Sequence, residues 1–364
     1  MTDIEALATD IENPYVSVDS DLDEWTCQVV EAHFDSETGT PYWLEWEREC
    51  DLDVRSAVSG FHDLHDVFEP FEEDVLRELP VERFAPQELG GQRHVYETGG
   101  TTGDPKRVIM RDYWRQQARW AMRLLPEDFP VGNLLMLGPP GGASNAGVFV
   151  QHLAHEWDVL PFHINMDPRW AKRLHQEDQD QFDRYVDHLL DQAERVLATQ
   201  DITILFTTSR LLELPRVRDL VAEYDVKGVY HGGTGLDRDT HRIFREEWYA
   251  DVAVAGEYGN TLMGVAQEVP PRLCGPEERE YHLDYIPAYP YFVPEIVDDN
   301  SHLVDYGERG TVRLTVLNEE FFLPLLYERD EATRVRGIGP CDWDWIRNPG
   351  TASGRAQEAT EGVY

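Results

Sequence analysis

The sequence predicts an α/β fold, in which a doubly wound, mostly parallel sheet is followed by a small β subdomain. Two observations carry this prediction: short apolar segments alternate with longer helical segments between residues 133 and 255, and helical periodicity stops after Pro270. Strands that alternate with helices are typical of parallel sheets covered on both faces. Of the 364 residues, 41% are hydrophobic and 11% aromatic, so the net charge of −38 does not indicate disorder.

The chain divides into four predicted parts. Residues 1–92 read as helices and loops of an N-terminal part, and residues 93–270 as the α/β region that binds nucleotide and substrate. Residues 271–345 read as the β subdomain, and residues 346–364 as a disordered tail.

The predicted elements follow one another with little space between them. Apolar periodicity favours helices over 112–125, 146–157, 181–199, 211–224 and 238–248. Short apolar runs favour parallel strands over 133–137, 159–164, 202–207, 226–230 and 251–255. Two further strands are predicted in the β subdomain, over 291–297 and 311–317.

The charge of the chain excludes several kinds of partner. With 32 Lys and Arg against 70 Asp and Glu, the surface repels nucleic-acid backbones and anionic membranes. No long apolar run and no basic, apolar leader occur, so we expect a soluble, cytoplasmic protein. Only three lysines are present (Lys106, Lys172 and Lys227), a composition similar to that of proteins from salt-adapted organisms.

A loop rich in glycine and threonine precedes one of these rare lysines. Residues 96–107 read YETGGTTGDPKR. Such a loop can offer backbone N–H groups and hydroxyls to phosphate oxygens, while the ammonium adds a point charge. It is not a Walker A loop, because Asp104-Pro105 precedes the lysine and Arg107 follows it. The alternative is a hairpin turn with an incidental lysine.

Residues 98–106 resemble the signature Thr-Ser-Gly-Thr-Thr-Gly-x-Pro-Lys of the adenylate-forming enzymes, with Gly99 in place of serine. Residues 231–236 (HGGTGL) and 257–261 (EYGNT) are similar to two later motifs of that family. Residues 324–330 (PLLYERD) are similar to the motif whose aspartate binds ribose; because this motif is short, Asp330 and Glu331 both remain candidates. Phenylacetate-CoA ligases are the large branch that the sequence resembles, especially the griseoluteate type of phenazine-antibiotic biosynthesis.

The resemblance implies that the protein uses ATP and Mg²⁺ to activate a carboxylic acid. Lys106 and Thr261 take the catalytic positions, and Glu257 is a candidate Mg²⁺ ligand because Leu262 stands where the family has its glutamate. The residues implied for nucleotide binding are Thr98, Gly99, Gly100, Thr101, Thr102, Gly103, Gly233, Thr234, Glu257, Tyr258, Gly259, Asn260 and Asp330. Those implied for the acid are Gly141, Gly142, Asn145, Phe149, His152 and Gly232.

The resemblance leaves the acyl acceptor open. The chain ends about 35 residues after Asp330, so we expect the family's mobile C-terminal domain to be absent, as in the griseoluteate type. This favours activation of an aromatic carboxylic acid for a partner reductase, with a homodimer as one option for assembly. The alternatives are an aryl-CoA ligase, an acyl-protein synthetase using Cys341, and a non-catalytic nucleotide-binding protein. Acidic neighbours of Cys341 favour a structural thiol instead.

Overall fold

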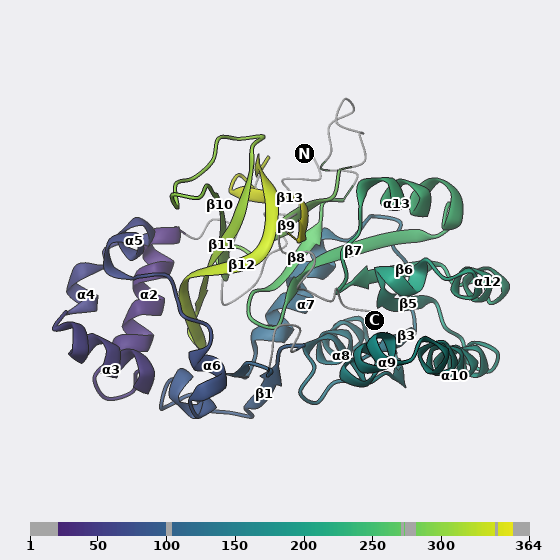
Figure 1. Ribbon diagram of the computed structural model, residues 1–364, viewed down its shortest axis with the longest axis horizontal. Helices are drawn as coiled ribbons and strands as arrows, with labels where there is room; N and C mark the ends of the chain where they lie inside the picture. Colours follow the sequence, from purple (N-terminus) through teal and green to yellow (C-terminus); the bar gives the residue numbers. More distant parts are fainter. Residues whose placement is uncertain (1–20, 100–103, 271–272, 274–281, 339–340, 352–364) are drawn as a thin grey trace.

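An eleven-stranded sheet organises the protein in the computed structural model, which describes residues 21–99, 104–270, 273, 282–338 and 341–351 (Figure 1). Its strand order is β10-β11-β12-β13-β9-β8-β7-β6-β5-β3-β4. In Figure 1 the N-terminal helices lie on the left, the antiparallel strands in the middle, and the parallel strands with α8–α13 on the right. The predicted α/β class is confirmed.

The parallel half contains β3 (Leu134–Gly138), β4 (Pro161–Asn165), β5 (Ile204–Thr208), β6 (Gly228–Gly232) and the first part of β7 (Ala253–Asn260). Every residue of β3, β5 and β6 is buried. These strands have helices on both faces, which explains their continuous apolar sequences. The chain leaves β3 first toward β4 and then returns to β5 on the other side of β3, so the sheet changes winding direction between β3 and β5.

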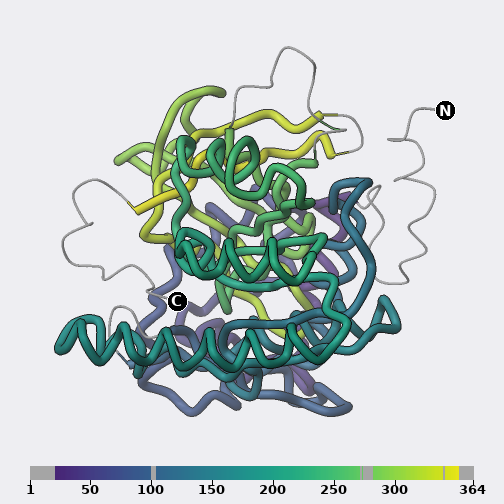
Figure 2. Tube along the Cα trace, turned by 90° about the vertical axis from the view of Figure 1, so that its right-hand side faces the viewer, coloured from purple at the N-terminus to yellow at the C-terminus, as the bar shows by residue number. Residues whose placement is uncertain are grey.

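Helices cover both faces of this half. α7 (Tyr113–Leu124) and α8 (Asn145–Trp157) share a core with Met136, Phe206 and Tyr230. α10 (Gln179–Leu197) and α12 (Pro215–Glu223) pack with Leu135, Leu205 and Val229 on the other face. Figure 2 shows α10 and the shorter helices of this layer crossing that side of the molecule. The winding is therefore double, as predicted.

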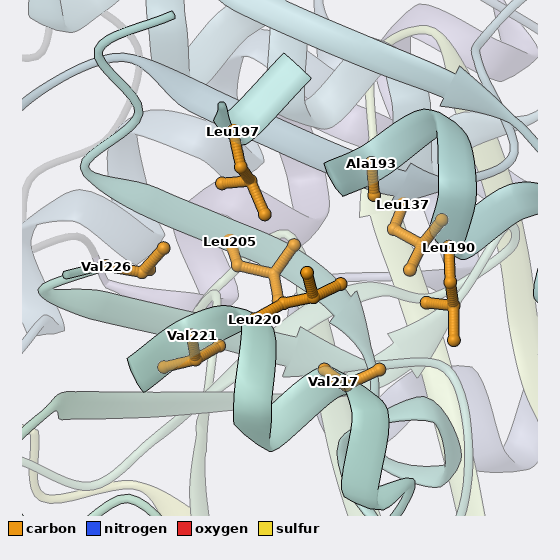
Figure 3. A pocket seen from close by; sticks show the side chains of 9 residues that line it. All are labelled: Leu137, Leu190, Ala193, Leu197, Leu205, Val217, Leu220, Val221 and Val226. Atoms are coloured by element: carbon orange, nitrogen blue, oxygen red, sulfur yellow. The ribbon is translucent and has the colours of Figure 1, made fainter. Parts of the chain in front are cut away.

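The packing of α10 and α12 on the sheet leaves a small void, shown in Figure 3. Its volume is about 10 Å³ and only aliphatic side chains line it. A buried water needs about this much space and also two or more polar partners, which this lining does not offer. The void is a packing feature of the core.

Several helix boundaries differ from the prediction. The helix predicted at 211–224 is divided into α11 (Ser209–Leu212) and α12, because Pro215 cannot continue the hydrogen-bonded turn before it. α13 (Arg238–Ile243) gives way to a π-helical turn at Phe244–Trp248. The unpredicted α9 (Pro168–Glu177) precedes α10.

The antiparallel half is larger than predicted and joins the parallel half without interruption. β7 pairs in parallel with β6 through Gly256 and then antiparallel with β8 from Glu257 onward. The remaining strands are β8 (Gly264–Glu268), β9 (Asp284–Pro287), β10 (Phe292–Val297), β11 (Arg309–Asn318), β12 (Phe321–Arg336) and β13 (Asp344–Thr351). The predicted disordered tail was wrong for residues 346–351, because β13 pairs with β12 and β9 there.

The N-terminal helices pack against β11 and β12. They are α2 (Leu22–Phe34), α3 (Pro41–Cys50), α4 (Val54–Ala57), α5 (Leu64–Val67) and α6 (Val75–Glu78), with 3₁₀ turns at Phe61–Asp63 and Val81–Phe84. The indole N–H groups of Trp25 and Trp43 donate to the carbonyl oxygens of Leu317 (3.0 Å) and Phe322 (3.2 Å). A separate antiparallel pair, β1 (His94–Glu97) and β2 (Arg107–Met110), follows the helices. In the described ranges, no helix combines the length and hydropathy needed to cross a membrane.

Candidate nucleotide and acid site

A cleft of about 760 Å³ opens at the carboxyl ends of the parallel strands. Its walls include the turn after β3, the ends of β5 and β6, and the segment from Glu257 to Val265. Open α/β sheets bind ligands outside the carboxyl ends of their strands, where the winding direction changes. The cleft lies at that point between β3 and β5.

The glycine-threonine loop is the connection of the β1–β2 hairpin. Thr98 N donates to Lys106 O (3.0 Å), and Lys106 N donates to Thr98 Oγ1 (3.0 Å). Thr98, Gly99 and Lys106 line the cleft. The predicted phosphate-binding residues Gly100, Thr101, Thr102 and Gly103 lie outside the described residues. The segment is thus a hairpin, and its base faces the cleft.

Lys106 is held by an acidic partner. Its ammonium donates to Glu73 Oε2, and its side chain retains 13% of its exposure. Arg77 Nε donates to the carbonyl oxygen of Asp104 (2.7 Å), so the segment around α6 supports the hairpin from outside. Lys106 also opposes the rise in the pKa of Glu328 that burial causes. The cation therefore stands among carboxylates at the rim of the cleft.

The motif at residues 257–260 forms the last four residues of β7, where the strand has left β6 and pairs with β8. Tyr258 OH donates to Asp330 Oδ2 (3.0 Å), and Asn260 Nδ2 donates to Glu328 Oε1 (2.9 Å). Burial raises the pKa of Tyr258 well above its usual value, so it stays a donor. Asp330 lines the cleft, whereas Glu331 pairs with Arg309. The structure favours Asp330 of the two predicted candidates.

Thr261 follows β7 and connects three elements. Its hydroxyl lies 3.1 Å from Asn145 Oδ1 and 3.3 Å from the carbonyl oxygen of Glu97. Asn145 is the first residue of α8, whose N-terminal end lines the cleft. The N-terminus of a helix carries partial positive charge and favours anions. Thr261, α8 and Lys106 together make this side of the cleft suitable for phosphate groups.

The turn after β6 brings backbone into the cleft. Gly233 has a φ of +75°, which few residues other than glycine adopt. At Gly232, an added Cβ would lie 2.4 Å from Glu257 Cγ, so the close approach of the two strands requires glycine. Thr234 Oγ1 accepts from Arg210 N (3.2 Å) and fixes the far side of the turn.

A buried polar network supports this turn from behind. His231 Nδ1 lies 3.0 Å from Ser209 Oγ, and burial lowers the pKa of His231 to about 4, so its ring is neutral. Glu268 accepts from Arg245 (2.6 Å) and His241 (2.9 Å). Desolvation raises the pKa of Glu268, but the neighbouring Arg245 and His241 outweigh it and hold the pKa far below its usual range. The network fixes β6 relative to β7 and β8.

Glu257, the predicted Mg²⁺ ligand, lines the cleft. Burial raises the pKa of its carboxyl to about 8, so Mg²⁺ would have to displace a proton to bind it. Leu262, at the position of the family's glutamate, is 2% exposed and packs in the core. Among the described residues, no three His, Cys, Asp or Glu side chains gather as metal ligands would.

The residues predicted for the acid are only partly brought together. Gly141, Asn145 and Gly232 line the cleft, but Gly142, Phe149 and His152 do not. Phe149 is 1% exposed and contacts the rings of Trp114, Phe206 and Tyr230, because it lies on the face of α8 that covers the sheet. His152 lies on α8 near Arg115, and burial lowers its pKa.

Other cleft residues were not predicted. Met136 and Phe206 each lie two residues before the last residue of their strands, β3 and β5. Both line the cleft together with Val265. Their positions near the ends of predicted strands were a usable signal. Glu73 precedes α6 in a segment without a sequence motif, whereas Glu328 lies on β12 within the predicted ribose motif of residues 324–330 but was not itself predicted.

Cys341 is a structural residue. It is 3% exposed, and burial with Asp342 nearby raises the pKa of its thiol to about 12. A nucleophilic cysteine needs a thiolate in a partly exposed, electropositive setting. The structure therefore argues against the acyl-protein synthetase alternative that relied on this residue.

Comparison with known proteins relates the fold to solved structures. No protein-family model matches the chain, and no curated protein matches it. The crystal structure of 2-hydroxyisobutyryl-CoA ligase in the postadenylation state, in complex with R3-HIB-AMP, matches with a TM-score of 0.56 and 15% identity. That match covers 90% of this chain and 65% of that chain.

An open conformation of the same ligase, in complex with 2-HIB-AMP and CoA, matches with a TM-score of 0.60 and 15% identity over 90% of this chain and 72% of that chain. The chain therefore shares the fold of this ligase. Because the identity is low and this chain spans about two thirds of the ligase, the likeness concerns architecture, and activity is a separate question.

Proposed function

We propose that the protein activates an aromatic carboxylic acid with ATP, forming an acyl-adenylate and pyrophosphate. The observation that carries this proposal is the meeting of Lys106, Thr261 and Asp330 in one cleft at the winding change of the sheet. The cation, the hydroxyl and the helix N-terminus suit phosphate groups, and the carboxylate suits ribose hydroxyls.

The reaction joins a carboxylate oxygen of the acid to the α-phosphorus of ATP, while the bond from that phosphorus to the β-phosphate oxygen breaks and pyrophosphate leaves. Catalysis then consists of positioning and of neutralising charge on phosphate oxygens. Lys106 would hold β- and γ-phosphate oxygens with Thr98, Thr101 and Thr102. Thr261 would contact the α-phosphate, and Asp330, oriented by Tyr258, would bind the ribose.

In this proposal Mg²⁺ would be held mainly by the phosphates of ATP. Glu257 would have to lose a proton before it could add a ligand. Mg²⁺ commonly binds through substrate phosphates and water with only one or two carboxylates, and we route no step through it.

We propose that the aromatic ring of the acid lies against the apolar lining residues Met136, Phe206 and Val265, beside the backbone of Gly232 and Gly233, which also line the cleft. Concave sites that are mainly apolar, with few polar groups, suit a planar ring. We propose that the adenylate passes to a partner reductase, because the sequence contains no GxGxxG dinucleotide motif after a strand.

CoA is the second candidate acceptor. The fold neighbour is a CoA ligase that was crystallised with 2-HIB-AMP and CoA. Formation of an aryl-CoA thioester by this protein alone would favour that function over transfer to a reductase. Release of adenylate to a reductase without any thioester would favour the first.

The proposal is tested by pyrophosphate release at molar salt with a panel of aromatic acids. We expect Lys106→Ala to lose most acid-dependent release, by roughly 100-fold or more, since a charge that meets phosphate in the transition state is removed. Lys227→Ala is the matched control, because that exposed lysine pairs only locally with Asp225. ATP binding without pyrophosphate release for any acid would instead identify a non-catalytic nucleotide-binding protein.

A further inference from the structure

Glu257 places a carboxyl at the acid end of the cleft. The side chains of a strand alternate between faces, so Glu257 lies on the same face as Ala255 and two residues nearer the carboxyl end of β7. On the neighbouring strands the corresponding end positions hold small residues, Gly232 on β6 and Thr208 on β5. The side chain of Glu257 lies over Gly232, where an added Cβ would be 2.4 Å from Glu257 Cγ, and Glu257 lines the cleft.

One oxygen of the Glu257 carboxyl has no hydrogen-bond partner in the described part of the chain. Its Oε2 is buried and has no hydrogen-bond partner among the described residues. The adjacent Tyr230 hydroxyl donates to Gln267 Oε1 (2.6 Å), and its interaction with the Glu257 carboxyl offsets the effect of burial only in part. Buried polar groups almost always have a partner, and leaving one unsatisfied is costly.

Among the described residues, no positive charge compensates the carboxyl. The only effects on its pKa are burial, which raises the pKa, and a weaker opposing hydrogen bond from Tyr230. Met136, Phe206 and Val265 form the nearby floor of the cleft. The residue is half-buried and lines the cleft, and its Oε2 is buried. An acid bound there would bring its far end to this carboxyl.

We propose that Glu257 selects acids that carry a hydrogen-bond donor, a hydroxyl or an amine, at the end remote from the carboxylate. This inference rests on the proposed function and narrows its substrate class. A protonated carboxyl can both donate to and accept from a hydroxyl, and an ionised carboxyl can accept from an ammonium group. A hydroxyl can therefore donate to one carboxyl oxygen and accept from the other, and an ammonium group can donate to both, whereas a methyl or ethyl group can do neither. Rotation of the carboxyl about its last torsion costs little, so either oxygen can meet the donor.

The experiment compares acids that differ only in this donor. Pyrophosphate release is measured with meta- and para-hydroxybenzoate against the methylbenzoates, and with the aminomethylbenzoates against the ethylbenzoates, which are similar in size. For at least one pair we expect the donor-bearing acid to have a kcat/KM about 100-fold above its apolar counterpart, because the apolar acid leaves the carboxyl unpaired.

Glu257→Leu should reverse this preference, lowering kcat/KM for the donor-bearing acid about 100-fold while that for the apolar acid stays equal or rises. Glu257→Gln retains the shape and a neutral hydrogen-bonding group, so it should keep activity with a hydroxyl acid and lose it with an ammonium acid. Glu223→Gln, on the exposed side of α12, is the matched control.

Calorimetry distinguishes the two donors. Acid binding is measured at pH 7 in two buffers that differ in ionisation enthalpy. An ammonium acid should release about one proton on binding, because Glu257 must ionise to pair with it, whereas a hydroxyl acid should release none.

Two results would overturn the inference, and they differ. If acids release pyrophosphate but each pair reacts equally in the wild type and in Glu257→Leu, Glu257 does not select the substrate and the proposed function stands. If no acid in the panel releases pyrophosphate, the proposed function fails, and this inference fails with it.

Discussion

At the scale of single residues, a bound ligand would change the surroundings of two ionisable side chains in the cleft. Lys106 is neutralised by Glu73, and Glu257 holds a proton that water would remove. The substitutions Glu73→Gln and Glu257→Gln measure the free-energy cost of these two arrangements without knowledge of the substrate. Both keep the shape of the side chain and remove its ability to ionise.

Glu257→Gln should stabilise the fold at neutral pH. The pKa of this carboxyl is raised from 4.5 to about 8, so below pH 4.5 the folded and unfolded states are equally protonated. As the pH rises above 4.5, the unfolded state gains stability by ionising while the folded state does not. We expect the variant to be more stable by on the order of 2 kcal/mol at pH 7.5 and by less at pH 5.5.

Thermal unfolding of both proteins at the two pH values measures this difference. A gap in melting temperature that is equal at both values would show that Glu257 is not protonated in the folded state.

Glu73→Gln should strengthen ATP binding. Phosphate oxygens must compete with the Glu73 carboxylate for Lys106 and are repelled by it. Partly exposed pairs contribute up to about 1 kcal/mol, so we expect a decrease in the Kd for ATP of roughly threefold to fivefold. Calorimetric titration measures it, with Glu72→Gln, an exposed neighbour, as control. Weaker binding by Glu73→Gln would show that Glu73 helps to hold the nucleotide.

At the scale of elements, a partly buried ion pair joins the N-terminal helices to the sheet. His65 Nε2 on α5 lies 3.0 Å from Glu295 on β10, and Arg313 on β11 donates to the same carboxylate (3.1 Å). Glu295 raises the pKa of His65, against burial and the nearby Arg313. The pair therefore depends on the proton carried by the imidazole.

His65→Gln should destabilise the protein more at pH 6 than at pH 9. A histidine with a raised pKa contributes its full stabilisation below the unfolded value of 6.5 and loses it as the pH rises through the folded value. We expect a loss of about 1 kcal/mol at pH 6, typical of a hydrogen bond to a charged group. Urea unfolding measures it, with the exposed His62→Gln as control; equal losses at both pH values would contradict it.

The elements differ in how well the sequence predicted them, for physical reasons. β3, β5 and β6 were predicted to within about two residues because burial on both faces makes them continuously apolar. β12 was missed because its second half carries charged side chains and is stabilised by pairing with β11 and β13. Long-range pairing of this kind leaves no local pattern.

The site shows the same division. The loop ending in Lys106 and the turn containing Gly232 were found because glycine at close backbone approaches is visible in a sequence. Phe149 was placed wrongly because apolar residues on α8 follow the same periodicity whether they face a cleft or the sheet. The unsatisfied carboxyl of Glu257 could not be predicted, since its lack of partners depends on β6 and β8.

At the scale of the whole molecule, the net charge of −38 acts on every element at once. Repulsion between like charges opposes the compact state and is screened within about 10 Å at 0.1 M salt and about 3 Å at 1 M. We expect the melting temperature to rise by several degrees or more between 0.1 and 2 M KCl. Scanning calorimetry across this range measures the rise, and sucrose at matched osmolality separates screening from water exclusion. A melting temperature independent of salt would contradict this account of the acidity.

β7 crosses from the parallel to the antiparallel half without a break, and this continuity sets a length scale for the reaction. Glu257 lies three residues before Asn260, the last residue of β7, a distance of about 10 Å at roughly 3.3 Å per residue, and Thr261 follows in the turn to β8. The strand therefore fixes the distance between the two positions that the ends of the acid would contact. An acid whose remote group reaches Glu257 while its carboxylate meets the phosphate beside Thr261 must have one particular length, so the protein should discriminate by chain length as strictly as by polarity.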